Sequence, residues 1–259
     1  PGVVPVDVTK DAQQAETVFE WPEELNLPGY RVPGRPNGKQ IREAVELLVS
    51  AKRPVFLLGG GVLRSRASEE VRVLVEAANA PFVTTLMARG ALPDSHPQHL
   101  GMPGMHGDVA AVASLQRSDL IIAIGARFDD RVTGRLDSFA PAAKVVHADI
   151  DPAEISKNRG ARVPFGGRGA RVARARLAAL AAGRADRDDR DYEAWWQLMN
   201  GLRENYPLGW TATADGFTAP QHVISRISAI SGPESIFVAG VGQHQMWSSQ
   251  FIDFEEPYS

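Results

Sequence analysis

Short apolar runs recur along the chain, and the segments between them carry apolar residues at helical spacing. The runs are Val55–Leu58, Phe82–Leu86, Leu120–Ile124 and Lys144–Ile150. Runs of this length and composition are typical of strands buried on both faces of a parallel sheet. Because strands that alternate with helices form βαβ units, the pattern predicts an α/β fold with a doubly wound parallel sheet.

The predicted helices surround these strands. Asn37 can cap a helix with Ile41, Ala44, Val45 and Leu48 on one stripe. Further helices are predicted from Ser68, over Asp108–Leu115, from Pro152, over Tyr192–Tyr206 and over His222–Ile230. The Tyr192–Tyr206 helix is amphipathic and is expected to dock on a neighbour. Two more strands are predicted near the ends of the chain, over Val4–Val8 and Ser235–Ala239.

Composition narrows the class of protein. Of 259 residues, 44% are apolar and 23% charged, which is typical of a soluble globular protein with a sizeable core. The sequence has no apolar run of about 18 residues, so we expect no membrane span. The first residues of this sequence lack the basic and then apolar pattern of a signal peptide. Zero cysteines exclude disulfides and thiolate chemistry, and they fit a cytoplasmic location. A net charge of −3 gives no electrostatic case for nucleic acid.

Arginines recur between residues 160 and 191, a pattern that is typical either of a nucleic-acid-binding arm or of a solvated helix and linker. Asp186, Asp188, Asp189 and Asp191 dilute the positive charge, and no aromatic residues are interleaved. The solvated interpretation is therefore favoured.

The densest cluster of opposite charges follows the third predicted strand, in Gly125-Ala-Arg-Phe-Asp-Asp-Arg-Val-Thr-Gly134. In an open α/β sheet, ligands bind outside the carboxyl ends of the strands. This loop is therefore either a salt-bridged solvated loop or a site for an anionic ligand.

Other strand ends carry similar alternatives. Gly59-Gly60-Gly61 forms a tight turn or lets a phosphate or ring approach the backbone. Gly101–Gly107 places Met102, Met105 and His106 on a loop that packs on the core or contacts a heterocycle. Asp149 can accept a hydrogen bond from a ribose, whereas Asp151 can cap a following helix. Together these features predict a nucleotide-like ligand above the strand ends.

Five motifs occur in order along the chain: Thr84–Gly90, Gly101–Gly107, Gly125–Gly134, His147–Ile155 and Gly240–Trp247. Taken together, they resemble the large catalytic subunits of acetolactate synthase (acetohydroxyacid synthase), which are thiamine-diphosphate enzymes.

The resemblance implies a set of cofactor contacts. Asp130 and Arg131 would border the substrate channel, with Arg131 binding the carboxylate of the 2-keto acid. Gln243 and His244 would contact thiamine diphosphate. The resemblance assigns flavin contacts to Gly60, Thr85, Leu86, Gly104, Met105, His106, Gly125, Ala126, Arg127, Phe128, Asp129, Asp149 and Ile150.

The resemblance also implies a domain organisation. Residues 1–20 would end an N-terminal thiamine-pyrimidine domain, 21–36 would be a linker, and 37–182 a central FAD-binding domain. Residues 183–215 would be a connecting helix and linker, and 216–259 the start of a C-terminal thiamine-diphosphate domain. The family's activating glutamate and its Mg²⁺-binding Gly-Asp-Gly motif are not found in the chain. The family's flavin-contacting Gly-Asp pair is here Gly167-Arg168, which reverses the local charge.

The activity that the resemblance implies is condensation of two pyruvates, or of pyruvate and 2-ketobutyrate, with loss of CO2. This reaction belongs to valine, leucine and isoleucine biosynthesis. It requires thiamine diphosphate and Mg²⁺, whereas FAD has a structural role. No metal site is predicted in this chain, and the chain alone is expected to be inactive. The implied partners are a second or further copies, in a homodimer or homotetramer, and a small regulatory subunit. The alternatives are another carboligase, such as glyoxylate carboligase, or a non-catalytic nucleotide-binding fragment.

Overall fold

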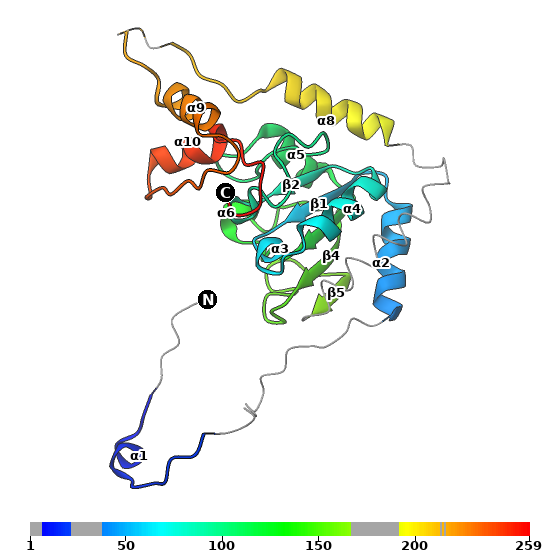
Figure 1. Cartoon of the computed structure of the whole chain (residues 1–259). Helices are drawn as coiled ribbons and strands as arrows, with labels where there is room; N and C mark the ends of the chain where they lie inside the picture. Colours follow the sequence, from blue (N-terminus) through cyan, green and yellow to red (C-terminus); the bar gives the residue numbers. More distant parts are fainter. Residues whose placement is uncertain (1–6, 22–37, 167–191, 213, 215) are drawn as a thin grey trace. The chain divides into compact units, whose positions relative to one another are not determined.

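A computed structural model describes residues 7–21, 38–166, 192–212, 214 and 216–259 (Figure 1). The chain divides into two compact units, residues 1–31 and 32–259. In the first unit the helix α1 (Lys10–Gln14) buries none of its residues. The predicted strand over Val4–Val8 falls mostly outside the described residues, and Val8 itself belongs to no strand. The proline-rich segment 21–36 lies, apart from Trp21, outside them as well.

The second unit is built on a five-stranded parallel sheet. Its strands are β1 (Pro54–Leu58), β2 (Phe82–Thr84), β3 (Leu120–Ile124), β4 (Lys144–Asp149) and β5 (Val163–Gly166). Their order is β2-β1-β3-β4-β5, and every neighbouring pair is parallel. The predicted α/β class is confirmed. The strand β5 was not predicted, because four residues that include a proline and a glycine give too little periodicity.

Alternate residues of the strands feed two separate cores. One face of the sheet buries Phe56, Leu58 and Ile122 beneath α2 (Gly38–Ser50), α3 (Gly61–Arg64) and α4 (Ser68–Ala78). The other face buries Leu57 and Ile121 beneath α5 (Val109–Arg117) and α8 (Glu193–Asn205). Helices therefore cover both faces, and this explains why the strands are apolar throughout rather than alternating (Figure 1).

Two short helices follow the carboxyl ends of strands: the 3₁₀ helix η1 (Leu86–Ala88) after β2 and α6 (Asp130–Thr133) after β3. The strand β2 is thus shorter than predicted, because the chain turns after Thr84. The predicted helix from Pro152 is wrong: residues 152–156 form turns only. Asp151 nevertheless accepts a hydrogen bond from the Ala153 amide at 2.9 Å, so it caps a turn rather than a helix.

The predicted amphipathic helix near residue 200 is confirmed as α8, and it docks on the sheet's own core. Trp195 and Met199 are buried. The indole Nε1 of Trp195 donates to the Pro54 carbonyl at 3.1 Å, and that of Trp196 donates to the Asn79 carbonyl at 3.0 Å. These contacts hold α8 against the start of β1 and the end of α4.

The C-terminal part contains the helices α9 (Pro220–Ser231) and α10 (Gln243–Phe251), which pack on one another (Figure 1). The predicted strand over Ser235–Ala239 is wrong, since no strand is assigned to these residues. Ile236 and Val238 are 75% and 92% exposed. A strand requires hydrogen-bonded neighbours, and the described part of the chain offers this segment none. No helix among the described residues is long and apolar enough to cross a membrane.

Candidate functional site

The residues predicted to bind a flavin follow the carboxyl ends of four neighbouring strands. Gly60 follows β1, Thr85 and Leu86 follow β2, the loop from Gly125 follows β3, and Asp149 ends β4. The strand order reverses between β1 and β3, and a doubly wound sheet with this order binds its ligand at that switch point. The sheet therefore gathers segments far apart in sequence at one edge.

Glycines allow two strand ends to approach closely at this edge. Gly125 has φ +62°, and a Cβ on it would lie 2.6 Å from the Cα of Gly61. A Cβ on Gly59 would overlap the carbonyl group of Gly125. The two strand ends thus approach backbone to backbone, and only glycine permits this. The glycine run is therefore required by close packing of the chain on itself, and the Gly61 amide donates to the Gly125 carbonyl at 3.0 Å across this contact.

The loop after β3 has two halves with different surroundings. Phe128 has φ +53° and is buried, with its ring edge-on to His147 at a centroid distance of 5.1 Å. The Nε2 atom of His147 lies 2.7 Å from the Ala126 carbonyl oxygen. Burial lowers the pKa of His147, so the ring is neutral and donates that hydrogen bond. The first half of the loop is therefore anchored in the core through Phe128 and a histidine that the sequence did not single out.

The second half of the loop is solvent-facing. The Asp129 carboxylate accepts from the Arg131 amide at 3.1 Å and thereby caps α6, and it lies 3.5 Å from the Arg127 Nε. Asp130 and Arg131 are exposed, and neither has an ion pair within the described ranges. The Arg131 guanidinium is available for a planar, bidentate contact with an external carboxylate.

The Met-rich loop lies against the charged loop. Gly104 has φ +118°, and a Cβ on it would lie 2.5 Å from the Arg131 carbonyl oxygen. Met102 is buried, whereas Met105 is 73% exposed. Both ring nitrogens of His106 are buried without a hydrogen-bond partner in the described part of the molecule. A buried, unpaired imidazole is costly, so His106 is suited to a polar ligand atom.

The end of β4 contributes a carboxylate beside an apolar surface. Asp149 accepts from the Asp151 amide at 2.9 Å, and burial raises its pKa. Ile150 is 59% exposed. On the β2 side, Leu86 and Met87 are 42% and 64% exposed. A surface that combines exposed apolar side chains with a few polar groups is suited to a flat heterocycle with polar edges.

Gln243 and His244 are not brought into direct contact with these residues. Both are exposed at the start of α10. The link to the sheet edge runs through the other end of that helix, where Gln250 Nε2 donates to the His106 carbonyl at 2.7 Å. Gly167 and Arg168 lie outside the described residues. No group of three or more His, Asp or Glu side chains that could hold a metal ion occurs among the described residues.

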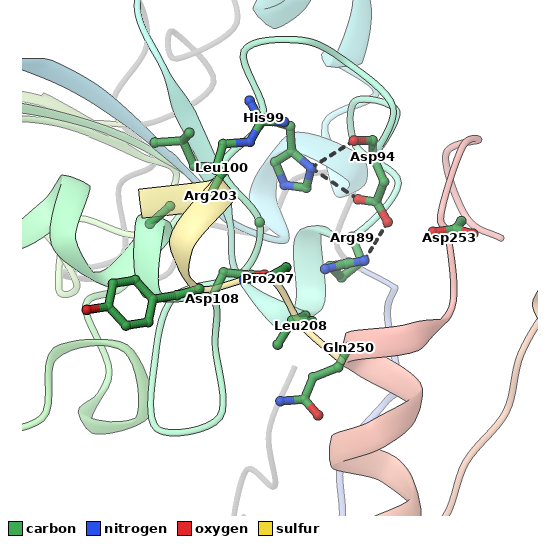
Figure 2. A pocket seen from close by; sticks show the side chains of 13 residues that line it. Arg89, Asp94, His99, Leu100, Asp108, Arg203, Pro207, Leu208, Gln250 and Asp253 are labelled. Carbon is green, nitrogen blue, oxygen red and sulfur yellow. Dashed lines mark hydrogen bonds and ion pairs between the residues drawn. The ribbon is translucent and has the colours of Figure 1, made fainter. Parts of the chain in front are cut away.

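Sequence reasoning missed a charged cluster beside α10. Figure 2 shows Arg89, Asp94 and His99 pointing toward one another at the edge of a cavity of about 250 Å³. Arg89 and Asp94 form an ion pair, and His99 Nδ1 lies 3.4 Å from Asp94 Oδ1. Burial raises the pKa of Asp94 to about 6 and lowers that of His99 to about 3. The signal available in the sequence was four ionisable residues, with His96 as the fourth, within eleven positions.

Known proteins resemble this chain along its whole length. It is 54% identical to the acetolactate synthase of Mycobacterium bovis over 259 residues, which is 100% of this chain and 42% of the relative. It is 51% identical to the acetolactate synthase large subunit of Corynebacterium glutamicum over 257 residues, 99% of this chain and 41% of the relative. The chloroplastic acetolactate synthase 2 of Nicotiana tabacum is 39% identical over 99% of this chain and 38% of its own length.

The resemblance read from the five motifs is thus confirmed, and the chain spans about 40% of the length of the curated relatives it matches. The model of the thiamine pyrophosphate enzyme central domain matches residues 41–175, which include the whole parallel sheet and the loops at its carboxyl edge. With more than half of its residues covered by that model, the chain belongs to the family of thiamine pyrophosphate enzymes, as the carrier of their central domain.

Proposed function

We propose that this chain is the flavin-binding middle part of an acetolactate synthase large subunit, which condenses two 2-keto acids with loss of CO2. Identity of 51–54% over essentially the whole chain to bacterial proteins of that name carries the proposal. Glyoxylate carboligase and a non-catalytic fragment are not favoured, because the named relatives are acetolactate synthases from both bacteria and plants.

In this proposal residues 37–182 form the central FAD-binding domain. The flanking segments 1–20 and 216–259 belong to the two thiamine-binding domains, with 21–36 and 183–215 as connections. FAD would lie on the glycine edge between β1 and β3, with His106 donating to a ring heteroatom and Asp149 accepting from a hydroxyl. The close approach of Gly61 and Gly125 and the unpaired nitrogens of His106 support this fit.

Each loop around the edge would then have a role. Gly60, Thr85, Leu86, Gly104 and the backbone of Gly125–Asp129 would contact the flavin through backbone groups or apolar surface. Phe128 would act through its backbone, because its side chain is buried in the core. Met105 and Ile150, both exposed, would cover the flat ring.

The substrate side of the proposal involves Arg131. Its exposed guanidinium would bind the carboxylate of the acceptor 2-keto acid in a planar, bidentate contact, with Asp130 beside it. Thiamine diphosphate, when bound with Mg²⁺, supplies the electron sink for loss of CO2. Gln243 and His244 would hold that cofactor in place. A small regulatory subunit would be the partner, as the name "large subunit" of the relatives suggests.

The test is the formation of acetolactate from pyruvate by the intact protein that contains this chain, with FAD, thiamine diphosphate and Mg²⁺ added. Arg131→Lys should raise the KM for pyruvate about tenfold, because a point charge replaces a bidentate fork. Arg135→Lys is the matched control, since Arg135 directly follows the loop, its side chain is 83% exposed, and it pairs only with Asp137 among the described residues. Equal pyruvate kinetics for both variants would reject the assignment of Arg131, and no turnover by the wild type would reject the function.

A further inference from the structure

The pair of helices α9 and α10 is not held in place by an apolar core. The buried residues on them are Ser228 on α9 and Ser249 on α10. Ile227 and Ile230 of α9 are 47% and 75% exposed. Burial of large apolar side chains normally fixes how a helix is seated. Among the described residues, apolar packing at α10 is limited to the buried Ile252 that follows the helix and to the ring contact between Phe251 and Trp210. Polar contacts must therefore help to fix α10, which carries the candidate thiamine contacts.

A polar clamp grips the segment that follows α10. The Asp94 amide donates to the Phe254 carbonyl at 3.0 Å, and the Phe254 amide donates to Asp94 Oδ2 at 2.8 Å. Arg89 pairs with the same carboxylate oxygen, donates to the Ile252 carbonyl at 3.2 Å, and lies 5.1 Å from the centre of the Phe254 ring. We call Arg89 and Asp94 the clamp; Figure 2 shows them beside α10.

The clamp is almost fully withdrawn from water. The side chains of Arg89 and Asp94 are 9% and 11% exposed. Arg89 Nε and Asp94 Oδ1 have no hydrogen-bond partner among the described residues. A buried ion pair of this kind contributes little net stability, because desolvation offsets the attraction. Its directional hydrogen bonds do define a single geometry for the chain that it holds, so a positioning role fits it better than a stabilising one.

A second set of polar contacts, between Ser95 and Glu255, lies next to the clamp and is called the second latch. The amide and hydroxyl of Ser95 donate to the two oxygens of the Glu255 carboxylate at 3.0 and 2.5 Å. Gly90 lies so close to the Glu256 carbonyl that a Cβ would overlap it. The segment 252–256 is therefore laid along the loop 89–95 by backbone and side-chain contacts together.

The helix α10 connects the clamped segment 252–256 to both candidate cofactor sites. Gln250, four residues before the clamped Phe254, donates to the carbonyl of His106 in the proposed flavin loop. Gln243 and His244 lie two turns further toward the start of the same helix, about 10 Å away at the helical rise of 1.5 Å per residue. A helix of this length is rigid, so its far end moves when the clamped end moves.

We propose that Arg89 and Asp94 are positioning residues for thiamine diphosphate: they seat α10 so that Gln243 and His244 are held at a fixed place relative to the flavin loop. This inference rests on the proposed function. It assigns Gln250 the role of connecting the two cofactor sites through the His106 carbonyl.

Amide hydrogen exchange of the FAD-loaded intact protein without thiamine diphosphate tests the seating itself. Asp94→Asn and Arg89→Met should each accelerate exchange of residues 243–254 about tenfold and leave β3 unchanged. Arg72→Met is the matched control, because Arg72 forms an exposed ion pair with Glu69 on α4 at 2.6 Å. If Asp94→Asn fails to fold, Glu255→Gln opens only the second latch and should show the same change in smaller measure.

Cofactor titration tests the consequence. The concentration of thiamine diphosphate that gives half-maximal activity should rise about tenfold in Arg89→Met, with kcat reduced much less and FAD content unchanged. Arg89→Lys keeps the charge and should recover part of this loss. Unchanged exchange of α10 in both clamp variants would overturn the proposal, as would equal losses of FAD and thiamine affinity. If the clamp variants show the expected faster exchange but the wild type binds no thiamine diphosphate, the proposed function would be rejected instead.

Discussion

Two apolar segments of this chain have nearly the same sequence character and opposite structures. Leu120–Ile124 forms β3, whose residues are all buried between two parallel neighbours. Ser235–Ala239 has a similar run of four apolar residues, 236–239, before a glycine turn, yet it forms no strand, and Val238 is 92% exposed. Apolar composition therefore identifies a strand candidate, and hydrogen-bonded neighbours decide whether the strand forms.

The same difference extends to the loops that follow these segments. The loop after β3 is fixed on three sides: by Gly61, by His147, and by the buried ring of Phe128. The loop after Ala239 leads into α10, whose seat depends on polar contacts at its far end. A site on the first loop is thus preorganised by the sheet, whereas a site on the second depends on the clamp.

The largest effect is expected where the two strand ends meet. Gly125→Ala should destabilise the protein by about 4 kcal/mol, because a Cβ there adds overlap with Gly61 to the strain of a positive φ. Gly134→Ala is the matched control: its φ of +58° is similar, but its Cβ would meet open space. It should cost about 1–3 kcal/mol, because its ψ of −133° places it in a conformation that glycine adopts far more readily than alanine. Urea unfolding measures both, and equal losses would show that close approach at Gly125 is unimportant.

Truncating one residue in each apolar segment compares the segments directly. Ile121→Ala should cost about 3 kcal/mol, since the side chain is fully buried and a cavity would remain. Val238→Ala, at a position 92% exposed, should change the free energy of unfolding by less than about 0.5 kcal/mol. A large loss at Val238 in the same urea experiment would mean that this segment is packed in solution.

The free energy of unfolding should depend on pH through Asp94 of the clamp and its neighbour His99. The pKa of Asp94 is raised to about 6 from 3.8, chiefly by burial, so the folded state binds the proton more tightly than the unfolded state between these values. Asp94 therefore makes stability fall as pH rises through this window. His99, with its pKa lowered to about 3 from 6.5, acts in the opposite sense: stability falls as pH decreases from 6.5 toward 3.

Asp94→Asn removes only the first of these two opposing contributions. The free energy of unfolding of the variant should therefore rise more steeply between pH 4 and pH 6 than that of the wild type, by at most about 1.4 kcal/mol per pH unit. Unfolding in urea at pH 4, 5 and 6 provides the measurement. A slope that is unchanged or shallower would contradict the buried state of Asp94.

The smallest effect concerns the solvent-facing half of the loop after β3. Asp129→Ala should cost about 1 kcal/mol, because it removes the cap on the Arg131 amide at the start of α6. Asp137→Ala, which breaks an exposed ion pair with Arg135, should cost close to nothing. Thermal unfolding of the two variants side by side distinguishes a cap from a surface pair.

Several features of the protein were determined by the sequence alone. The strands β1, β3 and β4 and the helices α2, α4 and α8 were read within a few residues, because burial on both faces of a sheet or on one face of a helix imposes a strong local period. The five motifs carried the family resemblance without reference to any contact. Charge at the end of β3 indicated where a site would lie, because parallel strands present their carboxyl ends at one edge.

Tertiary structure decided what depends on distant partners. The segment Leu120–Ile124 forms a strand because other parts of the chain supply neighbouring strands, whereas Ser235–Ala239 has none among the described residues and forms no strand. The glycine run after β1 is explained by its close contact with Gly125, which lies 64 positions after Gly61. The clamp joins Asp94 to Phe254 across 160 positions. Local periodicity cannot encode such contacts, because their energy arises from groups that only the folded chain brings together.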